Sequence, residues 1–446
     1  MAEVDTDIVI LGGGLAGLTA AYELRDLDVV VLESRQRVGG RTKSLGDSDA
    51  WVNAGAQIIT SQRIKDFCEM LGLELVSVDG ADFGLVVRGK FSRGPSAERL
   101  FLALNLGLGE KTDFARTVLR LQRVMHKVAK MSPEERLELD DTDLRTVLGS
   151  ASPSTIEILN GFCEEATGSP VEDVSALIGL VYSLTAYIDA DARKGMYAVR
   201  GGTQSIALGL ASHLPDGAVR LGCRVRSVRT VDGVAEVRYE QDGEEQTLRA
   251  RHAISALPAP VVLDVVADLP DDVRNALEHR SPYSTLITVT IPVRDGVEAP
   301  WDGVFFIPTP GGSARFGLIT NYGHLAQTLD PARGGYLAIL ANGRKGTAAA
   351  RQTDDQLVAD FVADLEAIFP GAGALIERER AEVQRWDPVG LPSMRPGSYR
   401  TRAALRHPIG ALRLCGDYTA EPGLAGANNS GYYVAGAVRS LLTGTT

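Results

Sequence analysis

The stretch Ile8-Val9-Ile10-Leu11-Gly12-Gly13-Gly14-Leu15-Ala16-Gly17 decides the fold of this chain. Its first four residues form an apolar run that predicts a buried strand, and residues 18–26 continue after the glycines with a helical pattern. A second apolar run, Val29–Leu32, is followed at once by Glu33. A strand, a G-x-G-x-x-G turn, a helix and a second strand that ends on an acid are together typical of a βαβ unit that binds a dinucleotide.

The glycines and the acid have separate roles in such a unit. Gly12 permits the tight turn, Gly14 lets a pyrophosphate approach the backbone, and Gly17 lets the helix pack closely. The helix N-terminus presents unpaired N–H groups and roughly half a positive charge to the phosphates. Glu33 offers a carboxylate to a ribose diol. We therefore expect an α/β fold with a Rossmann-like nucleotide-binding domain.

Composition and charge exclude some classes of protein. The chain has 446 residues, enough for two or three domains, and its 44% hydrophobic and 23% charged content is ordinary for a globular protein. The formal net charge of −11 and the lack of a long Lys/Arg block argue against a nucleic-acid partner, because phosphate binding needs a dense basic surface. No apolar run approaches the roughly 18–20 residues that span a bilayer, so we expect no integral membrane segment.

The cysteines and the first residues indicate a reducing compartment. The cysteines are widely scattered, without a C-x-x-C pair or a histidine at metal-ligand spacing, so they predict neither a disulfide framework nor a zinc site. Acidic residues precede the first strand, which is unlike the basic start of an export signal. We therefore expect a cytoplasmic protein without a bound metal. The four cysteines are Cys68, Cys163, Cys223 and Cys415.

A second motif, Ser34-Arg35-Gln36-Arg37-Val38-Gly39-Gly40-Arg41-Thr42, follows Glu33 directly. Arg41 could be a bidentate partner of a phosphate, and the two glycines would let backbone approach it. Together with the first glycine turn, this motif resembles the flavin-containing amine oxidoreductase superfamily, which includes monoamine oxidases, protoporphyrinogen oxidases and carotenoid desaturases. The resemblance implies FAD rather than NAD, bound in a Rossmann-like domain of the glutathione-reductase type with an inserted α+β substrate domain.

The order of patterns along the chain predicts where these domains lie. Residues 81–194 read as largely helical, residues 219–252 as a β-meander with Asp-Gly turns, and residues 286–341 as short strands before an amphipathic helix at 354–369. We assign 1–80, 195–285 and 380–446 to the FAD-binding domain, and 81–194 and 286–379 to the substrate domain. The helices expected in the helical region are 100–108, 114–130, 144–148, 155–167 and 174–187.

The C-terminal segment carries the second strong signal. An apolar strand ends on Gly416-Asp417, and Gly426-Ala427-Asn428-Asn429-Ser430-Gly431-Tyr432-Tyr433 opens a helix that runs to residue 442. The N-terminus of that helix could stabilise negative charge on the N1–C2=O edge of a reduced flavin, and Asp417 could bind the ribityl chain. The family places matching residues in those roles, so we expect both ends of the chain to meet at one cofactor.

The resemblance also implies a set of cofactor-binding positions. A Gly-Ala turn after residue 54 would run beside the isoalloxazine ring, and the backbone of Val225 would contact the adenine. The implied positions are Gly12, Gly14, Leu15, Ala16, Gly17, Glu33, Ser34, Arg35, Gly40, Arg41, Gly55, Ala56, Gln57, Val225, Gly416, Asp417, Ala427, Ser430 and Tyr433.

Catalytic residues are less clearly indicated. Amine oxidases of the family keep the substrate nitrogen between two aromatic rings, and Tyr432 aligns with one of these tyrosines while the other position falls at Ser393. Trp386 could supply an aromatic wall instead, or could be a core residue. His324 could act as an acid or base, although a lone histidine is more often structural.

Two departures from the family pattern affect the chemistry. The oxidases usually carry a lysine on the strand that corresponds to 286–289, yet no lysine occurs between Lys194 and Lys345. The cysteine that tethers FAD in monoamine oxidases is replaced by Pro392, so we expect non-covalent FAD. Protoporphyrinogen oxidases and desaturases also lack that lysine.

Three functions remain open. The first is an FAD-dependent oxidoreductase that removes a hydride from a C–N or C–C bond of a mostly apolar small molecule, in specialised metabolism, with O2 or another electron acceptor. The second is a protoporphyrinogen-oxidase-like or desaturase-like dehydrogenase that forms C=C bonds. The third is a redox-neutral flavin isomerase or a non-catalytic FAD-binding protein.

Overall fold

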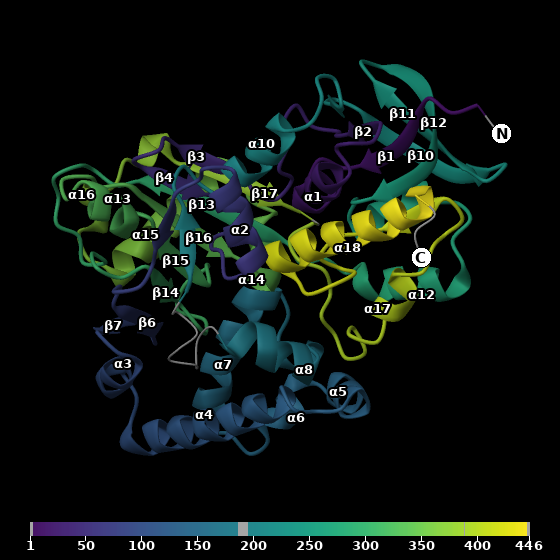
Figure 1. Ribbon diagram of the computed structural model, residues 1–446. Coiled ribbons are helices and arrows are strands. Elements are labelled where there is room, and N and C mark those ends of the chain that lie inside the picture. Colours follow the sequence, from purple (N-terminus) through teal and green to yellow (C-terminus); the bar gives the residue numbers. More distant parts are fainter. Residues whose placement is uncertain (1–2, 186–194, 388, 444–446) are drawn as a thin grey trace.

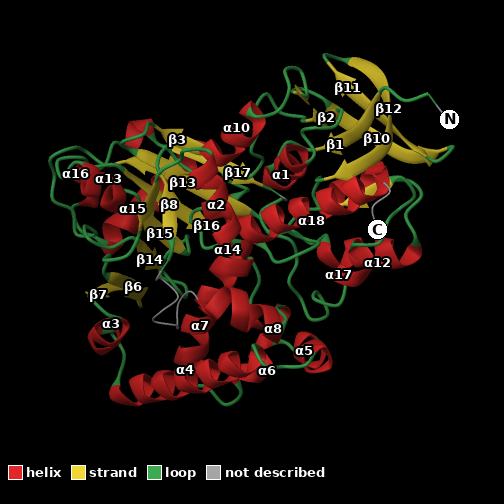
Figure 2. Cartoon of the chain, in the orientation of Figure 1, coloured by secondary structure: helices red, strands yellow, loops and turns green. Residues whose placement is uncertain are grey.

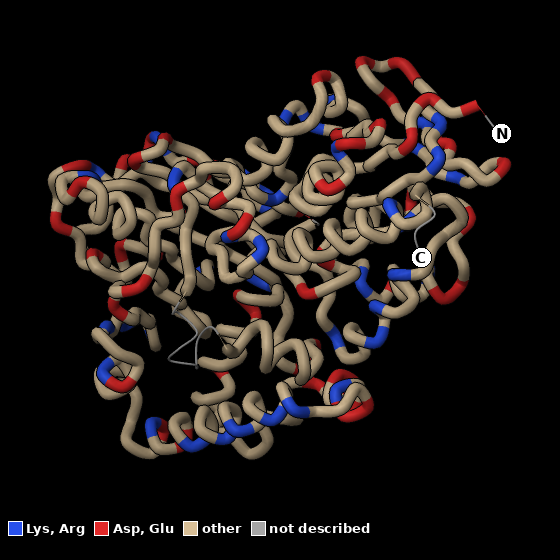
Figure 3. The backbone as a smooth tube through the Cα atoms, viewed as in Figure 1, with Lys and Arg blue, Asp and Glu red and all other residues tan. Residues whose placement is uncertain are grey.

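The computed structural model describes residues 3–185, 195–387 and 389–443. Two large sheets and a helical region make up this part of the chain (Figure 1), and helices lie against both sheets (Figure 2). Among the described residues, no helix is both long enough and apolar enough to cross a bilayer. Lys and Arg alternate with Asp and Glu over most of the backbone, whereas one long helix, α4 (Leu108–Val128), carries a row of basic residues (Figure 3).

The first sheet is built around β1 (Thr6–Leu11), which pairs in parallel with β2 (Val29–Leu32) and with β12 (Glu244–Ser255). Parallel strands covered on both faces read as continuous apolar runs, which explains the sequence pattern of the first two. Further parallel strands extend the sheet on either side: β9 (Val219–Arg220) beside β2, and β18 (Leu412–Leu414) beside β12. The first and last segments of the chain therefore share one sheet, as the sequence predicts.

Two helices cover one face of this sheet and pack against each other. They are α1 (Leu15–Glu23) and α18 (Gly423–Thr443). A Cβ atom at Gly17 would lie 2.0 Å from the carbonyl oxygen of Gly12, and one at Gly431 would lie 2.2 Å from the carbonyl oxygen of Ala16. Both glycines are needed for close packing, which is the role that the fingerprint assigns to Gly17.

The predicted meander is present as β10 (Arg224–Val231), β11 (Val234–Gln241) and β12, paired antiparallel. Asp232 and Gly233 both have positive φ, of 52° and 82°, and so does the next Asp-Gly pair. Two consecutive residues of positive φ match the twist of a tight hairpin turn, and Asp-Gly is a favoured sequence for it.

The second sheet is antiparallel throughout, in the order β14-β15-β16-β13-β17. Its strands are β13 (Leu286–Pro292), β14 (Phe306–Pro308), β15 (Leu318–Asn321), β16 (Tyr336–Ala341) and β17 (Glu382–Trp386). β17 pairs with β13, although the sequence analysis assigns residues after 380 to the nucleotide-binding domain. Glu382 and Gln384 interrupt any apolar run there, so the sequence gives little sign of this pairing. The predicted amphipathic helix is present as α15 (Asp354–Ile368), and its buried residues pack in one core with those of this sheet.

The helical region agrees with the prediction in part. Helix α6 (Leu144–Leu148) has the predicted bounds, and α7 (Pro153–Thr167) differs only at its start. The prediction missed a hairpin, β6 (Phe83–Val87) and β7 (Lys90–Gly94), whose turn at Arg88-Gly89 has positive φ at both residues. It also missed the charged helix α5 (Pro133–Asp140). The predicted helix 174–187 is a short α8 (Ala176–Ile178) continued by a π-helical segment, η2 (Gly179–Leu184), and its last two residues lie outside the described ranges.

The remaining elements are short. They are β3 (Ser44–Gly46), β4 (Trp51–Asn53), α2 (Gln62–Met70), β5 (Leu75–Ser77), α3 (Ala97–Ala103), η1 (Val171–Asp173), β8 (Tyr197–Val199), α10 (Gln204–Ser212), α11 (Ala259–Val265), α12 (Asp271–Arg280), α13 (Gly323–Leu329), α14 (Gly343–Ala349), α16 (Ala372–Leu375), η3 (Arg378–Arg380) and α17 (Arg402–Leu405). All four cysteines are buried free thiols. Among the described residues, no cluster of His, Cys, Asp and Glu has the geometry of a metal site.

Candidate active site

A cavity of about 1120 Å³, called here the main cavity, lies where the two sheets and the helical region meet. Its walls come from the turn before α1, the end of β12, η2, all five strands of the second sheet, and the start of α18. Pockets for one small ligand usually measure about 300–1,000 Å³. The main cavity therefore has room for an elongated ligand together with a small second molecule.

Two glycine turns form one end of the main cavity. The Gly39 N–H donates to the Gly13 carbonyl at 2.8 Å, and a Cβ atom at Gly40 would lie 3.2 Å from the Cα of Gly14. Side chains in place of these glycines would fill the space, so this end of the main cavity is lined by backbone atoms. No side chain caps the N-terminus of α1 after Gly14, so its N–H groups are free to bind an anion. This arrangement fits the pyrophosphate of a dinucleotide.

Glu33 lies beside these turns and is buried. Its carboxylate accepts hydrogen bonds from the N–H groups of Gly13 and Arg35, each at 2.8 Å. Val225 and Cys223 line the same cavity from the adjacent meander. The carboxylate thus fixes the glycine turn and faces the place where a ribose would lie, which fits the role predicted for Glu33.

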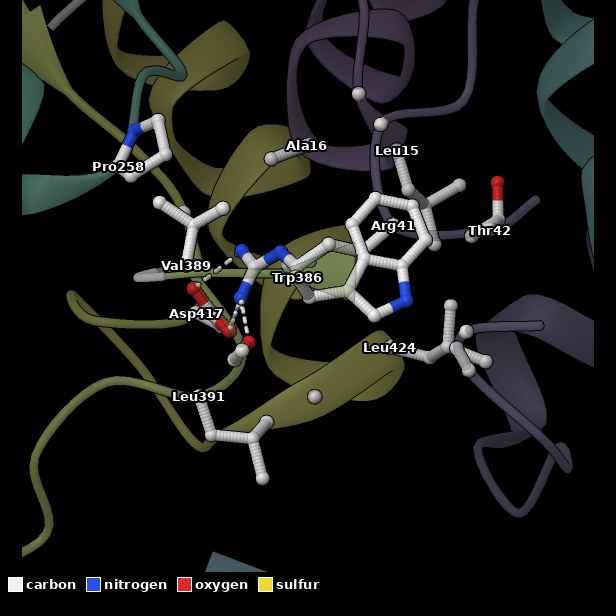
Figure 4. Close-up of a pocket in the computed structure, with 18 of the residues that line it drawn as sticks. Leu15, Ala16, Arg41, Thr42, Pro258, Trp386, Val389, Leu391, Asp417 and Leu424 are labelled. Atoms are coloured by element: carbon white, nitrogen blue, oxygen red, sulfur yellow. Dashed lines mark hydrogen bonds and ion pairs between the residues drawn. The ribbon is translucent and has the colours of Figure 1, made fainter. Parts of the chain in front are cut away.

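Arg41 and Asp417 meet on the wall of the main cavity (Figure 4). The guanidinium donates two hydrogen bonds to the carboxylate, at 2.9 and 3.0 Å, and a third to the Gly390 carbonyl at 2.8 Å. Burial is the largest single effect on Arg41 and lowers its pKa, but the charge and hydrogen bonds of Asp417, together with Tyr283 and Tyr182, outweigh it and raise the pKa. Arg41 is therefore permanently charged and is held by Asp417.

The other end of the main cavity is mostly apolar. Trp386, at the end of β17, is only 1% exposed and donates its indole N–H to the Ala54 carbonyl at 2.8 Å. Its ring lines the cavity at the border of the two ends (Figure 4), because the Arg35 guanidinium lies 5.3 Å from its centroid and Leu286 is its partner in β13. Tyr182 of η2 lies close to the start of α18, where a Cβ atom at Gly423 would be 3.0 Å from its hydroxyl. The apolar wall consists of Ile58, Ile64, Val181, Met196, Leu286, Phe306, Leu318 and Leu340.

Most of the predicted cofactor-binding residues line this one cavity. They are Gly12, Gly14, Leu15, Ala16, Glu33, Ser34, Arg35, Gly40, Arg41, Gly55, Ala56, Gln57, Val225, Gly416, Asp417 and Ala427. Gly17 and Ser430 lie behind its wall. Ser430 Oγ accepts the Gly416 N–H at 2.8 Å and thereby positions the turn before Asp417.

The structure places Tyr432 and Tyr433 away from the main cavity. Their side chains are 37% and 65% exposed, and the guanidinium of Arg63 lies 3.6 Å from the ring centroid of Tyr432. The reason is the start of α18, which is at Gly423 and not at Gly426 as predicted. Residues of its first turn line the cavity, whereas Tyr432 lies about 13 Å further along the helix axis at 1.5 Å per residue. This placement gives Tyr432 no contact with a substrate in the cavity.

Two further positions that the sequence analysis weighed also lie outside the main cavity. Ser393, the second cage position, is buried and does not line the main cavity. His324 lies in α13 outside the cavity, and burial lowers its pKa. Conversely, the sequence analysis missed Tyr182, Glu165 and Asn342, which do line it. They follow no motif, and only tertiary structure brings them together: α7 packs against η2 and α14, and Asn342 bonds to the Glu165 carbonyl.

A glycine-lined dinucleotide site joined to an apolar chamber, in a two-sheet architecture, defines a flavoprotein oxidoreductase. The chain belongs to the flavin-containing amine oxidoreductase family, whose family model matches residues 15–439. This membership confirms the predicted family and the FAD cofactor. The site residues agree with non-covalent binding, because Cys415 does not line the cavity and Cys223 lies at the Val225 end.

Individual proteins also resemble this chain, in sequence or in fold. A Dictyostelium discoideum protein named "Probable flavin-containing monoamine oxidase A" is 29% identical over 304 residues, which are 64% of this chain and 65% of that protein. The chain thus spans less than two thirds of the length of this curated relative. Cyclohexylamine oxidase from Brevibacterium oxydans has a TM-score of 0.80 at 19% identity, covering 98% of this chain and 100% of that one. An engineered putrescine oxidase variant has a TM-score of 0.79 at 21% identity, covering 98% and 99%. At these identities the two structures show a shared fold.

Proposed function

We propose that this protein is an FAD-dependent oxidoreductase that removes a hydride from the C–N bond of a mostly apolar amine. The observation that carries the proposal is the continuity of the main cavity, in which the dinucleotide-binding end and the apolar end form one space. Amine oxidation is also the activity named for the relative in Dictyostelium discoideum and for the two oxidases of similar fold.

The residues of the cavity have definable tasks in that reaction. The bound flavin supplies an acceptor for the hydride. The apolar wall excludes water and disfavours the charged form of an amine, so that the nitrogen is neutral when its C–H bond reacts. Trp386 and Tyr182 both line the cavity and supply aromatic surface that orients the substrate. The N-terminus of α18 favours negative charge that develops beside it, because residues of its first turn line the cavity.

A second candidate is a dehydrogenase that forms C=C bonds and passes electrons to an acceptor other than O2. The observation that favours it is the sequence of β13, Leu286-Ile287-Thr288-Val289-Thr290-Ile291-Pro292, which contains no lysine. The oxidases that the sequence resembles usually have a lysine on this strand. The side chain of Leu286 lines the cavity instead.

Anaerobic mixing of the holoprotein with a panel of apolar amines tests the proposal. The expected result is bleaching of the visible flavin band by an amine, followed by hydrogen peroxide on re-aeration if O2 is the acceptor. Bleaching without peroxide would favour a dehydrogenase. Product without bleaching would indicate an isomerase, and no bleaching by any amine would contradict the proposal.

A further inference from the structure

A second cavity of about 340 Å³, called here the side chamber, adjoins the main cavity. Glu165 and Asn342 line both cavities, so the two spaces meet at these residues. The walls of the side chamber come from α7, from the loop between β14 and β15, and from the start of α14. In contrast to the apolar wall beside it, this space is lined mainly by charged and polar residues.

Glu165 has a carboxylate without a partner among the described residues: no donor lies within hydrogen-bonding distance, and no ion pair forms. Its position is nonetheless fixed. Asn342 Nδ2 donates to the Glu165 carbonyl at 2.9 Å, and a Cβ atom at Gly317 would lie only 2.2 Å from the Glu165 Oε2. A glycine therefore makes room for this carboxylate at the boundary between the two cavities.

The cations of the side chamber are occupied by other groups. Arg344 pairs with Glu164, with its Nη2 3.0 Å from Oε2. Lys345 donates through Nζ to the carbonyls of Thr309 and Phe316, at 3.2 and 2.7 Å. Lys345 attracts the Glu165 charge without bonding to it. Two carboxylates of the side chamber are therefore left for a ligand, Glu157 and Glu165. Glu157 is exposed and lies over Gly311, whereas Glu165 is partly buried and also lines the main cavity, so Glu165 is the acidic group within reach of a ligand that occupies both spaces.

Burial makes ionisation of Glu165 costly while the side chamber holds only protein. It raises the pKa of the carboxyl to about 8, against the lowering effect of Lys345. A cation that enters the chamber would offset this cost, because an opposite charge within a few ångströms favours the ionised carboxylate. The site is thus suited to a cationic ligand.

We propose that the side chamber binds the distal cationic group of an elongated substrate, with Glu165 as its counter-ion, while the reacting C–N end lies in the main cavity. This inference rests on the proposed amine oxidation and specifies its substrate class as a bifunctional amine, such as an α,ω-diamine or an aminoalkyl guanidine. Glu165 then sets specificity and is not a catalytic residue.

Hexylamine and hexamethylenediamine provide a matched pair of probes, because they differ in the second ammonium group alone. In the wild-type holoprotein we expect the diamine to have a lower KM and, by perturbation of the oxidised flavin spectrum under anaerobic conditions, a lower Kd. In Glu165→Gln this advantage should fall by about tenfold or more, because the amide supplies no counter-charge for the second ammonium group. The readout is the ratio of the diamine value to the hexylamine value in each protein, so that any effect common to both probes cancels.

The matched control is Glu172→Gln, which removes the same charge from an exposed residue near Arg344 that lines neither cavity. It should leave the diamine advantage intact. Equal binding of both probes by the wild-type protein, or equal effects of the two substitutions, would overturn the inference. If hexylamine is oxidised and the diamine has no advantage, the inference about the side chamber is wrong while the proposed amine oxidation stands. If neither probe is oxidised, the Kd values from the flavin spectrum still show whether the diamine binds more tightly.

Discussion

Arg41 and Asp417 are 376 positions apart in sequence, and their side chains form a two-fold hydrogen-bonded ion pair in the wall of the main cavity. The sequence analysis assigns them to separate parts of the cofactor. The structure joins them, since one guanidinium links the second glycine turn to the end of β18 and to the Gly390 carbonyl. The ion pair therefore holds the N-terminal and C-terminal segments together at one site.

Arg41→Gln should destabilise the protein and weaken FAD binding together. The substitution leaves the buried Asp417 carboxylate, only 3% exposed, without its counter-ion. Loss of one partner of a buried pair costs about 3–5 kcal/mol, and we expect about 2–4 kcal/mol here because the Arg41 side chain is 31% exposed. Chemical denaturation of the apoprotein and the holoprotein measures both effects.

The exposed pair between Arg400 and Asp141 is the matched control for that experiment. Arg400→Gln should cost less than about 1 kcal/mol, because solvent screens exposed pairs. The double variant Arg41→Gln/Asp417→Asn should recover part of the loss. If Arg41→Gln lowers the free energy of unfolding no more than Arg400→Gln does, the Arg41–Asp417 pair does not stabilise the site.

Glu33→Ala should release FAD. The carboxylate holds two backbone N–H groups of the glycine turn and faces the ribose position, so its removal affects both the shape of the turn and the ligand. We expect the Kd for FAD to rise by roughly tenfold or more, which corresponds to about 1.4 kcal/mol. Fluorescence titration of the apoprotein measures it. The exposed Glu69→Gln on α2 is the control, and equal affinities of the two variants would contradict the role of Glu33.

The nucleotide-binding part was predictable from sequence because its signals are local. A glycine turn, an apolar strand and a terminal acid each restrict the backbone within a few residues, as Gly12 with φ of 102° illustrates. The Asp-Gly turns of the meander are local in the same sense. Family resemblance then extends the assignment to Arg41 and Asp417, which no spacing rule would bring together.

The substrate end could not be predicted in the same way. Glu165, Tyr182 and Asn342 come from α7, η2 and the end of β16, and only tertiary packing makes them neighbours. The error at Tyr432 has a different cause. Its short Ser-Gly-Tyr match ignores where the helix begins, and a shift of a few residues along a helix turns a side chain to another face.

Tyr432→Ala should leave turnover within about twofold of the wild type. The ring lies against Arg63 at the surface, so we expect only a small loss of stability, about 0.5–1 kcal/mol. Tyr182→Ala, inside the cavity, should lower kcat/KM by about tenfold or more at unchanged FAD content, because it removes a wall that orients the substrate. Stopped-flow flavin reduction compares the two. A large loss with Tyr432→Ala alone would contradict the placement of both residues.

Glu165 should make the stability of the holoprotein depend on pH in the absence of an amine. Its pKa is about 8 in the folded protein and 4.5 for an ordinary glutamate, so both states hold the proton at low pH. Between pH 4.5 and about 8 the unfolded state releases the proton first, and the free energy of unfolding therefore falls as the pH rises. A glutamine at this position cannot ionise, so the free energy of unfolding of Glu165→Gln should not fall over this pH range. Its free energy of unfolding should exceed that of the wild type by a margin that grows through this window and is constant above it, at on the order of 1–3 kcal/mol, and chemical denaturation at a series of pH values measures it. The free energy of unfolding of Glu172→Gln should depend on pH as that of the wild type does. The same pH dependence in all three proteins would show that Glu165 is not shielded from solvent.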